Sequence, residues 1–405
     1  MSEPTEILRI AARGDGLTMD GRHVAGAAPG DTIAADGSVT PGSHHVDPPC
    51  RHFGTCGGCQ LQHCDDETLS AFVTDRVIHA AQGQGLTART VAPTHLSPPH
   101  SRRRATLHAI NGGGGRALIG FRENGSHRLV DVKECPVLHP ALLEAVSALR
   151  ALLSPRKGRF SVDIELTLAD QGVDAALKGL SVEGLQQTEA LLDFARESGL
   201  ARLTLDQGFG PETMWEPEPV TVSLAGISVP LPPGAFLQAT SDAEAALAEA
   251  AVEWLQGCSA VADLFSGLGT FAFALAQGTK AKVLAAEAAR DAHLACKAAA
   301  GRAGLPVHAM HRDLFRNPLL AEDLARFDAV LLDPPRAGAR EQVSRLATSD
   351  VERIVYISCN PASWARDART LADGAYSLTE LRPVGQFRWS THVELASLFV
   401  RERAD

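Results

Sequence analysis

Alternation of strands and helices along the C-terminal half of the chain constrains the fold more than any other feature of the sequence. Short apolar runs rich in Val, Ile, Leu and Ala predict buried strands at residues 260–264, 281–286, 307–311, 327–332 and 353–357. Helical segments separate these runs, the last near residues 339–347. This alternation predicts an α/β fold with a doubly wound, parallel sheet.

A further helix precedes the first of these strands. Ser241 is followed three residues later by Glu244, a spacing typical of a capping box at a helix start. Apolar positions continue to Leu255, and Gly257 predicts the end of the helix.

Length and composition indicate a globular protein of two or three domains, since 405 residues with 45% hydrophobic and 21% charged content can bury full cores. No stretch approaches eighteen apolar residues, and the first residues lack the basic and apolar regions of a signal peptide. We therefore expect a cytoplasmic protein with no membrane contact. The formal charge of -10 excludes a global basic footprint, so a nucleic acid would have to bind a local patch.

The N-terminal half predicts smaller elements. Residues 5–35 indicate short strands broken by glycine, which suits a small β-barrel. Residues 35–49 are typical of a linker, in which we expect His44 and His45 to be solvated rather than metal ligands. Three arginines at residues 102–104 lead into a strand; they suit phosphate contacts, and a solvated sheet edge is the alternative.

The cysteines are concentrated in one short segment that contains Cys50, Cys56, Cys59 and Cys64. In a reducing compartment such a group is better explained by metal binding or catalysis than by disulfides. Thiolates bind soft metals, and the glycines between these cysteines let the backbone fold around an ion or a cluster. Zinc and an iron–sulfur cluster both fit, and Cys135 could complete a four-cysteine site.

A glycine-containing turn at residues 263–270 follows the first strand of the C-terminal half and opens a helix. Its glycines let the backbone approach a ligand closely, and Glu287, at the end of the next strand, could bind ribose hydroxyls. The pattern differs from the G-x-G-x-x-G of dinucleotide sites. Asp263 before the turn favours a nucleoside without pyrophosphate, such as S-adenosylmethionine, and Asp313 after the third strand could meet its adenine.

Two later strands end in residues with reactive or binding groups. The fourth ends in Asp333-Pro334-Pro335-Arg336, in which arginine replaces the aromatic residue of amine methyltransferases; this favours methylation of carbon. The fifth ends in Ser358-Cys359-Asn360-Pro361, where Asn-Pro forces a turn. Ligands bind beyond the carboxyl ends of parallel strands, so we expect Cys359 at the mouth of a site; a buried structural thiol is the alternative.

These motifs together resemble the S-adenosylmethionine-dependent RNA 5-methyluridine methyltransferases, in particular the iron–sulfur branch that acts on 23S ribosomal RNA. The resemblance covers nearly the whole chain and includes, in family order, further motifs at residues 120–127, 233–238 and 392–394. It implies a class I (Rossmann-like) methyltransferase domain at residues 231–405, a central α+β RNA-binding domain with an iron–sulfur cluster at residues 46–230, and a short TRAM/OB-like, β-barrel-like segment at residues 1–45.

The same resemblance implies roles for individual residues. Cys359 would be the nucleophile and Glu394 the base. The ligands of a [4Fe–4S] cluster would be Cys50, Cys56, Cys59 and Cys135. The cofactor and uracil sites would be lined by Gln238, Phe265, Thr270, Glu287, Asp313 and Asp333. Thr270 and Asp313 replace asparagines that are frequent in the family.

The chemistry of this reaction needs one thiolate and one base. C5 of uracil is a poor nucleophile, so a thiolate first adds to C6 and makes an enolate whose C5 attacks the sulfonium methyl group. A base then removes the C5 proton, and elimination of the thiolate restores the ring. A nearby cation such as Arg336 could lower the pKa of the thiol, and base extraction would make the uridine reachable.

Two alternatives remain at this point. One is the same chemistry on uridine 54 of transfer RNA, although bacterial relatives devoted to that substrate commonly lack the cysteine cluster. The other is an iron–sulfur or zinc RNA-binding factor without turnover, which would have no use for both Cys359 and Glu394. We expect a monomer that binds RNA, with 23S ribosomal RNA as the first candidate and transfer RNA as the second.

Overall fold

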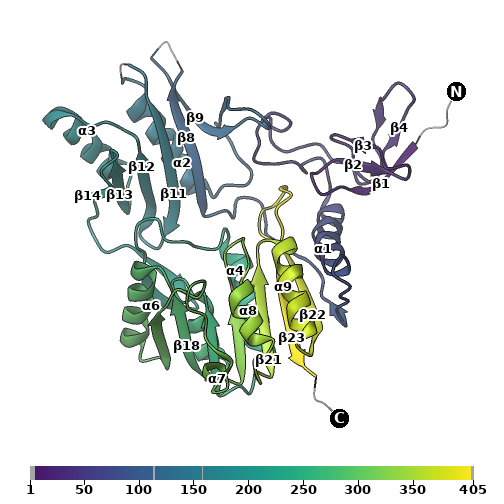
Figure 1. The fold of residues 1–405 in the computed structure, drawn as a ribbon. Helices are drawn as coiled ribbons and strands as arrows, with labels where there is room; N and C mark the ends of the chain where they lie inside the picture. Colours follow the sequence, from purple (N-terminus) through teal and green to yellow (C-terminus); the bar gives the residue numbers. More distant parts are fainter. Residues whose placement is uncertain (1–4, 113–114, 157, 403–405) are drawn as a thin grey trace. The chain divides into compact units, whose positions relative to one another are not determined.

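The computed structural model describes residues 5–112, 115–156 and 158–402 (Figure 1). The chain forms two compact units. The N-terminal unit comprises Met1–Thr68, Pro98–Thr221 and Phe387–Thr391, and the C-terminal unit comprises Leu69–Ser97, Val222–Gln386 and His392–Asp405. The chain therefore passes between the units several times, once for the short segment Phe387–Thr391 alone.

A nine-stranded sheet forms the centre of the C-terminal unit. Its strand order is β19-β18-β17-β20-β21-β23-β22-β6, and β7 also pairs with β22. The strands are β17 (Ala260–Leu264), β18 (Lys282–Glu287), β19 (Val307–His311), β20 (Ala329–Leu332), β21 (Arg353–Ser358), β22 (Tyr376–Gly385), β23 (Glu394–Arg401), β6 (Thr90–Val91) and β7 (His95–Leu96). The first five are parallel, and the strand order reverses at β17, which is where ligands bind in such sheets.

Helices cover this sheet. They are α4 (Ser241–Trp254), α5 (Thr270–Gly278), α6 (Arg290–Ala303), α7 (Ala321–Leu324), α8 (Arg340–Leu346) and α9 (Pro361–Asp373). Helix α4 packs against α5, whereas α8 packs against α9, which contacts β21, β22 and β23 (Figure 1). Every residue of β20 is buried, as expected for a parallel strand covered on both faces.

Helix α4 begins differently from the prediction. Its N-cap is Thr240, whose hydroxyl accepts a hydrogen bond from the amide of Ala243 at 3.3 Å, while Ser241 is already helical. The predicted capping box of Ser241 and Glu244 is therefore wrong. A tertiary contact explains the shift, because the Thr240 hydroxyl also lies 2.9 Å from that of Ser97 and this holds Thr240 in an extended conformation.

The N-terminal unit contains two sheets. The smaller has the order β3-β2-β1-β4-β5, and its hydrophobic core consists of Ile7, Ala27 and Ile33. Its strands are β1 (Thr5–Ile10), β2 (Gly16–Thr18), β3 (His23–Val24), β4 (Thr32–Ile33) and β5 (Val39–Thr40). The larger has the order β10-β9-β8-β11-β12-β13-β14. Its strands are β8 (Arg104–Asn111), β9 (Ala117–Arg122), β10 (Leu129–Asp131), β11 (Ser161–Ala169), β12 (Gly172–Lys178), β13 (Arg202–Asp206) and β14 (Pro211–Trp215).

Helices α2 (Pro140–Leu153) and α3 (Gly184–Glu197) contact each other and supply apolar residues to the core of the larger sheet. Helix α1 (Asp66–Gln82) starts in the N-terminal unit and continues into the C-terminal unit. The two-stranded ribbon of β15 (Thr221–Leu224) and β16 (Ile227–Pro230) also starts at a boundary between the units, at Thr221. In the part of the chain that the structure describes, no helix has the length and apolar character needed to cross a membrane.

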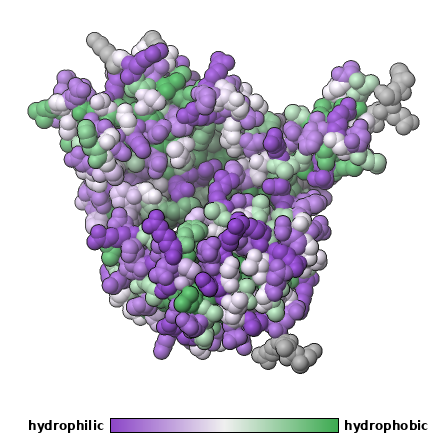
Figure 2. All heavy atoms as spheres, in the orientation of Figure 1, coloured by the Kyte–Doolittle hydropathy of each residue, from purple (hydrophilic) through white to green (hydrophobic). Residues whose placement is uncertain are grey.

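Hydrophilic side chains cover most of the face shown in Figure 2, and hydrophobic ones are scattered among them. The exposed large hydrophobic side chains include Met19, Phe209 and Phe236. Isolated exposures of this kind are normal on a protein surface. Phe236 is of interest because of the cavity that it lines.

Candidate active site

A cavity of about 670 Å³ lies in the C-terminal unit, where the parallel strands end. This volume suits a ligand of nucleoside size. Its lining includes every catalytic and cofactor residue predicted from the sequence except Asp313, namely Gln238, Phe265, Thr270, Glu287, Asp333, Cys359 and Glu394. The phenyl rings of Phe236 and Phe315 also line the cavity.

The turn after β17 forms one wall of the cavity. Gly267 and Gly269 have positive φ values of 53° and 93°, and a Cβ atom on Gly269 would lie 2.8 Å from Sγ of Cys296. Only glycine fits there, so the turn keeps its backbone close to the cavity. The carboxylate of Glu287 fixes the turn, because it accepts hydrogen bonds from the amides of Gly267 at 2.9 Å and Ala289 at 2.6 Å.

Two aromatic rings meet beside this turn. Phe265 has a φ of 65°, which is unusual for a bulky residue and typical of functional sites. Its ring centroid lies 5.3 Å from that of Phe315. Sequence reasoning missed Phe315, although an aromatic residue just after a strand end, in a loop that should face a ligand, was a usable signal.

Asp313 is placed differently from the other predicted cofactor residues. Its carboxylate accepts hydrogen bonds from the amides of Phe315 at 3.0 Å and Arg316 at 3.2 Å. The carboxylate thus caps the turn after β19, while Leu314 and Phe315 from that turn line the cavity.

The turns after β20 and β21 are tied to each other, and this positions Cys359. The side-chain amide of Asn360 donates to the carbonyl of Arg336 at 2.9 Å, and its oxygen accepts from the amide of Ala362 at 3.2 Å, capping α9. The hydroxyl of Ser363 donates to the same carbonyl at 2.9 Å. The Asn-Pro pair therefore ends the strand, starts the helix and joins two loops at the cavity.

The cavity contains several acidic groups. Burial raises the pKa of Asp333 to about 7. Burial, together with the charge of Asp333, raises the pKa of Glu394 to about 8, and Oε2 of Glu394 has no hydrogen-bond partner among the described residues. Both carboxyl groups therefore titrate near neutral pH.

Burial also raises the pKa of the Cys359 thiol, to about 11, and the charges of Glu394 and Asp333 add to this effect. The charge of Arg336 acts in the opposite direction, as predicted, but it is outweighed. A positively charged ligand in the cavity would favour the ionised forms of all three acids. The donor set therefore fits a nucleoside that carries a sulfonium group.

Gln238 is buried on another side of the cavity. Its side-chain oxygen accepts a hydrogen bond from the side-chain amide of Gln386 at 3.0 Å. The oxygen of Gln386 in turn accepts from the main-chain amide of Ala239 at 2.9 Å. These two hydrogen bonds link Gln238, a predicted residue of the cofactor and uracil sites, to Gln386, which directly precedes the segment Phe387–Thr391.

The four cysteines predicted as metal ligands all lie in the N-terminal unit. Cys50 is buried, whereas Cys56, Cys59 and Cys135 are half-buried. Burial raises the pKa of the Cys59 thiol to about 12, and the charges of Cys135, Cys56 and Cys50 add to this. Among the described residues, the four do not form a clear group of metal ligands.

Cys64 has different neighbours. Burial raises the pKa of its thiol to about 12, with contributions from the carboxylates of Asp65 and Asp31.

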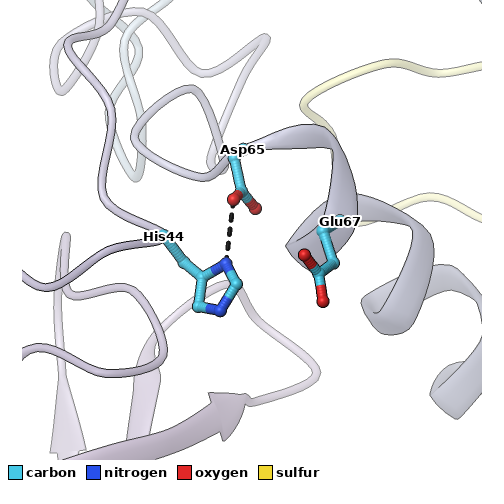
Figure 3. A group of neighbouring side chains, drawn as sticks. All are labelled: His44, Asp65 and Glu67. Carbon is cyan, nitrogen blue, oxygen red and sulfur yellow. Dashed lines mark hydrogen bonds and ion pairs between the residues drawn. The ribbon is translucent and has the colours of Figure 1, made fainter.

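A different group of possible ligands lies nearby in the same unit. The donor atoms of His44, Asp65 and Glu67 all lie within 4.8 Å of one another, and Nδ1 of His44 is 2.8 Å from the Asp65 carboxylate (Figure 3). His45 similarly lies 2.7 Å from the carboxylate of Asp31. Both histidines are half-buried, and each pairs with a carboxylate that is distant in sequence and that local composition does not reveal.

The three arginines at residues 102–104 also differ from expectation. The guanidinium of Arg102 lies over the ring of Phe387, 5.4 Å from its centroid, and Nε donates to the carbonyl of Arg104 at 2.9 Å. Burial lowers the pKa of both Arg102 and Arg104. Arg102 is therefore half-buried against Phe387 rather than part of a fully solvated edge.

Comparison with known proteins gives consistent matches. A family model described as tRNA (Uracil-5-)-methyltransferase matches residues 308–402. An uncharacterized RNA methyltransferase of Zymomonas mobilis is 49% identical over 397 residues, which cover 98% of this chain and 99% of that protein. The 23S rRNA (uracil(1939)-C(5))-methyltransferase of Pectobacterium atrosepticum is 31% identical over 379 residues, which cover 90% and 82%.

Among solved structures, the tRNA (uracil-54, C5)-methyltransferase of Pyrococcus abyssi in complex with S-adenosyl-L-homocysteine superposes with a TM-score of 0.74. The match covers 98% of this chain and 100% of that one, at 21% sequence identity. At this identity the likeness concerns the fold.

Proposed function

Since the chain belongs to the RNA (uracil-5-)-methyltransferase family, we propose that it methylates C5 of a uridine in 23S ribosomal RNA through a covalent bond between Cys359 and C6 of the base. The chain is an S-adenosylmethionine-dependent RNA methyltransferase specific for uracil C5, and the predicted class I methyltransferase fold is confirmed. The target RNA, the adduct and the residue roles are the proposal.

One observation carries the catalytic part of the proposal. Asp333, Cys359 and Glu394 stand at the ends of the adjacent strands β20, β21 and β23, and all three line the same cavity. A thiol and a buried carboxyl that face one cavity provide the nucleophile and the base that methylation at C5 needs.

The steps follow from these groups. The Cys359 thiol loses its proton to solvent, and its sulfur bonds to C6 while the electron pair of the C5–C6 double bond moves toward O4. C5 of this enolate takes the methyl group that S-adenosylmethionine supplies, and S-adenosyl-L-homocysteine would be the leaving group. Glu394 then accepts the proton from C5, the C5–C6 double bond forms again, and the bond between sulfur and C6 breaks.

The acidity of the site fits this order of events. A sulfonium charge in the cavity lowers the pKa of Cys359 and Glu394, which favours the thiolate needed for addition. Once the methyl group has left, the positive charge is gone and the carboxylate of Glu394 regains its affinity for protons. It becomes a better base at the step in which it must remove the C5 proton.

The other cavity residues bind and orient the uracil and the methyl donor. In this proposal Gln238 and Asp333 contact the uracil and the methyl donor, while Phe265, Thr270 and Glu287 hold the nucleoside. Asp313 contributes to the adenine site by capping the turn that presents Phe315.

The four cysteines Cys50, Cys56, Cys59 and Cys135 hold a [4Fe–4S] cluster in this proposal. The residue type supports it, since thiolates are the usual ligands of such clusters, and all four cysteines lie in the N-terminal unit. The cysteine set also favours ribosomal RNA over transfer RNA as substrate. The cluster supplies no step of methyl transfer here.

The test compares 5-methyluridine in RNA from a strain lacking the gene with that of the parent strain. We expect one 5-methyluridine to disappear from 23S ribosomal RNA, and the purified protein to restore it in vitro with S-adenosylmethionine. Loss at uridine 54 of transfer RNA, with intact ribosomal RNA, would instead establish the second candidate substrate. Unchanged 5-methyluridine in both RNAs would contradict the proposal.

A further inference from the structure

The loop between β20 and α8, residues 333–339, brings Arg336 into the cavity. The first residue of this loop is fixed by the sheet, since the amide of Asp333 donates to the carbonyl of Leu264 at 3.2 Å. Arg336 lies three residues further on, beyond the paired residues of β20. Its position therefore depends on the contacts that the loop makes. The loop, β21 and α9 all belong to the C-terminal unit.

Helix α9 fixes the main chain of this loop at three points. The carbonyl of Ala337 accepts a hydrogen bond from the guanidinium of Arg366 at 2.9 Å. The amide of Ala339 donates to the carboxylate of Asp367 at 2.7 Å. The third point is the carbonyl of Arg336, which accepts hydrogen bonds from side chains of the N-cap and the first turn of the same helix.

The carboxylate of Asp367 is buried and surrounded by donors. One of its oxygens accepts two hydrogen bonds from the guanidinium of Arg366, at 2.9 and 2.7 Å. The other accepts from the Tyr356 hydroxyl of β21 at 2.8 Å, besides the amide of Ala339. Such partners compensate a carboxylate for the loss of water. They also fix its orientation, so the loop is attached to a rigid group.

The loop approaches this pair so closely that only glycine fits. Gly338 has a φ of 84°, and a Cβ atom there would lie 2.5 Å from Oδ2 of Asp367 and 2.6 Å from Nη2 of Arg366. The amide of Gly338 also donates to the carbonyl of Pro335 at 2.8 Å, which closes a tight turn. A methyl group at this position would therefore push the loop away from α9.

The same helix is tied to the proposed nucleophile. Helix α9 begins two residues after Cys359, with Asn360 as its N-cap. One element thus sets the distance between the main chain that carries the thiol and the main chain that carries Arg336. Burial raises the pKa of the Cys359 thiol, whereas the charge of Arg336 lowers it. A displaced Arg336 would weaken this second effect.

We propose that Arg366 and Asp367 are positioning residues that act through Arg336. They fix the main chain of residues 336–339 to α9 and so hold the guanidinium of Arg336 in the cavity, where its charge favours the thiolate of Cys359. This inference rests on the proposed function, because it takes Cys359 as the nucleophile.

The inference predicts that the first chemical step becomes slower. If the loop is released from α9, Arg336 moves and the thiolate that adds to C6 is less favoured. A displacement of about 1 Å can cost on the order of a hundredfold in rate. Glu394 stays in place, because β23 remains paired with β21 and β22. A methylated protein–RNA adduct should therefore not accumulate.

The experiment uses the full-length protein, radiolabelled S-adenosylmethionine and 23S ribosomal RNA from a strain that lacks the gene. Arg366→Ala and Asp367→Ala each remove one contact with the loop, whereas Gly338→Ala forces the loop away from an intact pair. We expect kcat to fall by about tenfold to a hundredfold, with the KM for S-adenosylmethionine changed by less than about threefold. Arg366→Lys and Asp367→Asn each keep a group that can contact the loop, and they should restore part of the activity.

A double variant tests whether Arg366 acts through Arg336. Arg336→Ala should itself lower kcat, and the addition of Arg366→Ala should cost little more, because the group that Arg366 positions is already gone. The same comparison is made without RNA by following the alkylation of Cys359 with iodoacetamide, using mass spectrometry of its peptide. Each single variant should slow the alkylation, and the double variant should be no slower than Arg336→Ala.

Two controls separate positioning from stability. Tyr356→Phe removes a hydrogen bond from the same carboxylate, but on the side of β21, and should leave kcat within about twofold of wild type. Gly257→Ala adds a methyl group at a similar φ of 80° with nothing within 4 Å, and should also leave kcat unchanged. If Asp367→Ala does not fold, as judged by circular dichroism, Arg366→Ala and Gly338→Ala replace it.

The outcomes separate the two proposals. Turnover and alkylation of both Arg366→Ala and Gly338→Ala within about twofold of wild type would overturn the inference, and so would effects of Arg336→Ala and Arg366→Ala that multiply in the double variant. If the wild type forms no 5-methyluridine in this RNA, the proposed function fails instead, and the alkylation of Cys359 still decides whether Arg366 acts through Arg336.

Discussion

Burial, rather than a neighbouring cation, has the largest effect on the pKa values of the ionisable residues in the active site. Asp333, Cys359 and Glu394 all have raised pKa values, and burial is the largest cause for each. The sequence indicated which residues would be there, because Asp333 and Cys359 follow predicted strands and the family resemblance implied Glu394. It did not predict their protonation, because that depends on how deeply the folded chain encloses them.

A raised pKa at Glu394 has a consequence for stability. The unfolded chain ionises this carboxyl near its usual value of 4.5, whereas the folded protein retains the proton up to about pH 8. The free energy of unfolding should therefore fall as pH rises between these values, by up to about 1.4 kcal/mol per pH unit from this group. Asp333, whose pKa is raised to about 7, contributes in the same direction.

Glu394→Gln should remove the part of this slope that belongs to Glu394. In urea unfolding experiments, the variant should gain stability over the wild type as pH rises from 5 to 8.5, with the gain on the order of 1 kcal/mol or more. Glu249→Gln, an exposed position on α4, is the control and should leave the slope unchanged. Parallel pH profiles for Glu394→Gln and wild type would refute the assignment.

At the scale of helices and strands, the sequence predicted those elements that depend on residues close to one another along the chain. The strands Ala260–Leu264 and Val307–His311 occur where the apolar pattern indicated them. The cap of α4, the partners of His44 and the burial of Arg102 could not be predicted, since each depends on a contact far along the chain. The same holds for Phe315, which faces the cavity only because its turn is capped by Asp313.

The glycine turn after β17 offers a test at this scale. Gly269→Ala would place a methyl group 2.8 Å from Sγ of Cys296 and from the ring of Phe273, at a φ of 93°. We expect a loss of stability of about 1–3 kcal/mol and weaker binding of S-adenosyl-L-homocysteine by calorimetry. Gly301→Ala, on α6 with open space around it, should instead be neutral or stabilise the protein by roughly 0.5–1 kcal/mol. Equal behaviour of the two variants would contradict this account of the turn.

At the scale of the whole molecule, the cysteines are a proposed second centre besides the cavity. Cys50, Cys56 and Cys59 come from one segment and Cys135 follows β10, and all four lie in the N-terminal unit. The sequence indicated the set through its spacing and its family resemblance. The main-chain hydrogen bonds from Gln60 and Leu61 to the carbonyl of Trp389 had no signal in the sequence.

Metal analysis tests this second centre. Protein purified without oxygen should be brown and contain about four iron and four sulfide ions per chain, as the formula of the cluster requires. Cys59→Ser should lose both, whereas Cys64→Ser should retain them, because the four proposed ligands are already supplied without Cys64. Colourless protein with one zinc ion per chain would show that the cysteines hold a different metal.

The most direct test of the proposed reaction follows the fate of the C5 proton. Glu394→Gln should still let Cys359 add to C6 and C5 take the methyl group, because neither step needs the carboxylate as a base. The thiolate cannot leave until the C5 proton is lost, so a covalent protein–RNA adduct carrying the label of S-adenosylmethionine should accumulate on a denaturing gel. It should disappear in the double variant with Cys359→Ala. Normal turnover of Glu394→Gln, or an adduct that survives the loss of Cys359, would contradict the roles assigned to these two residues.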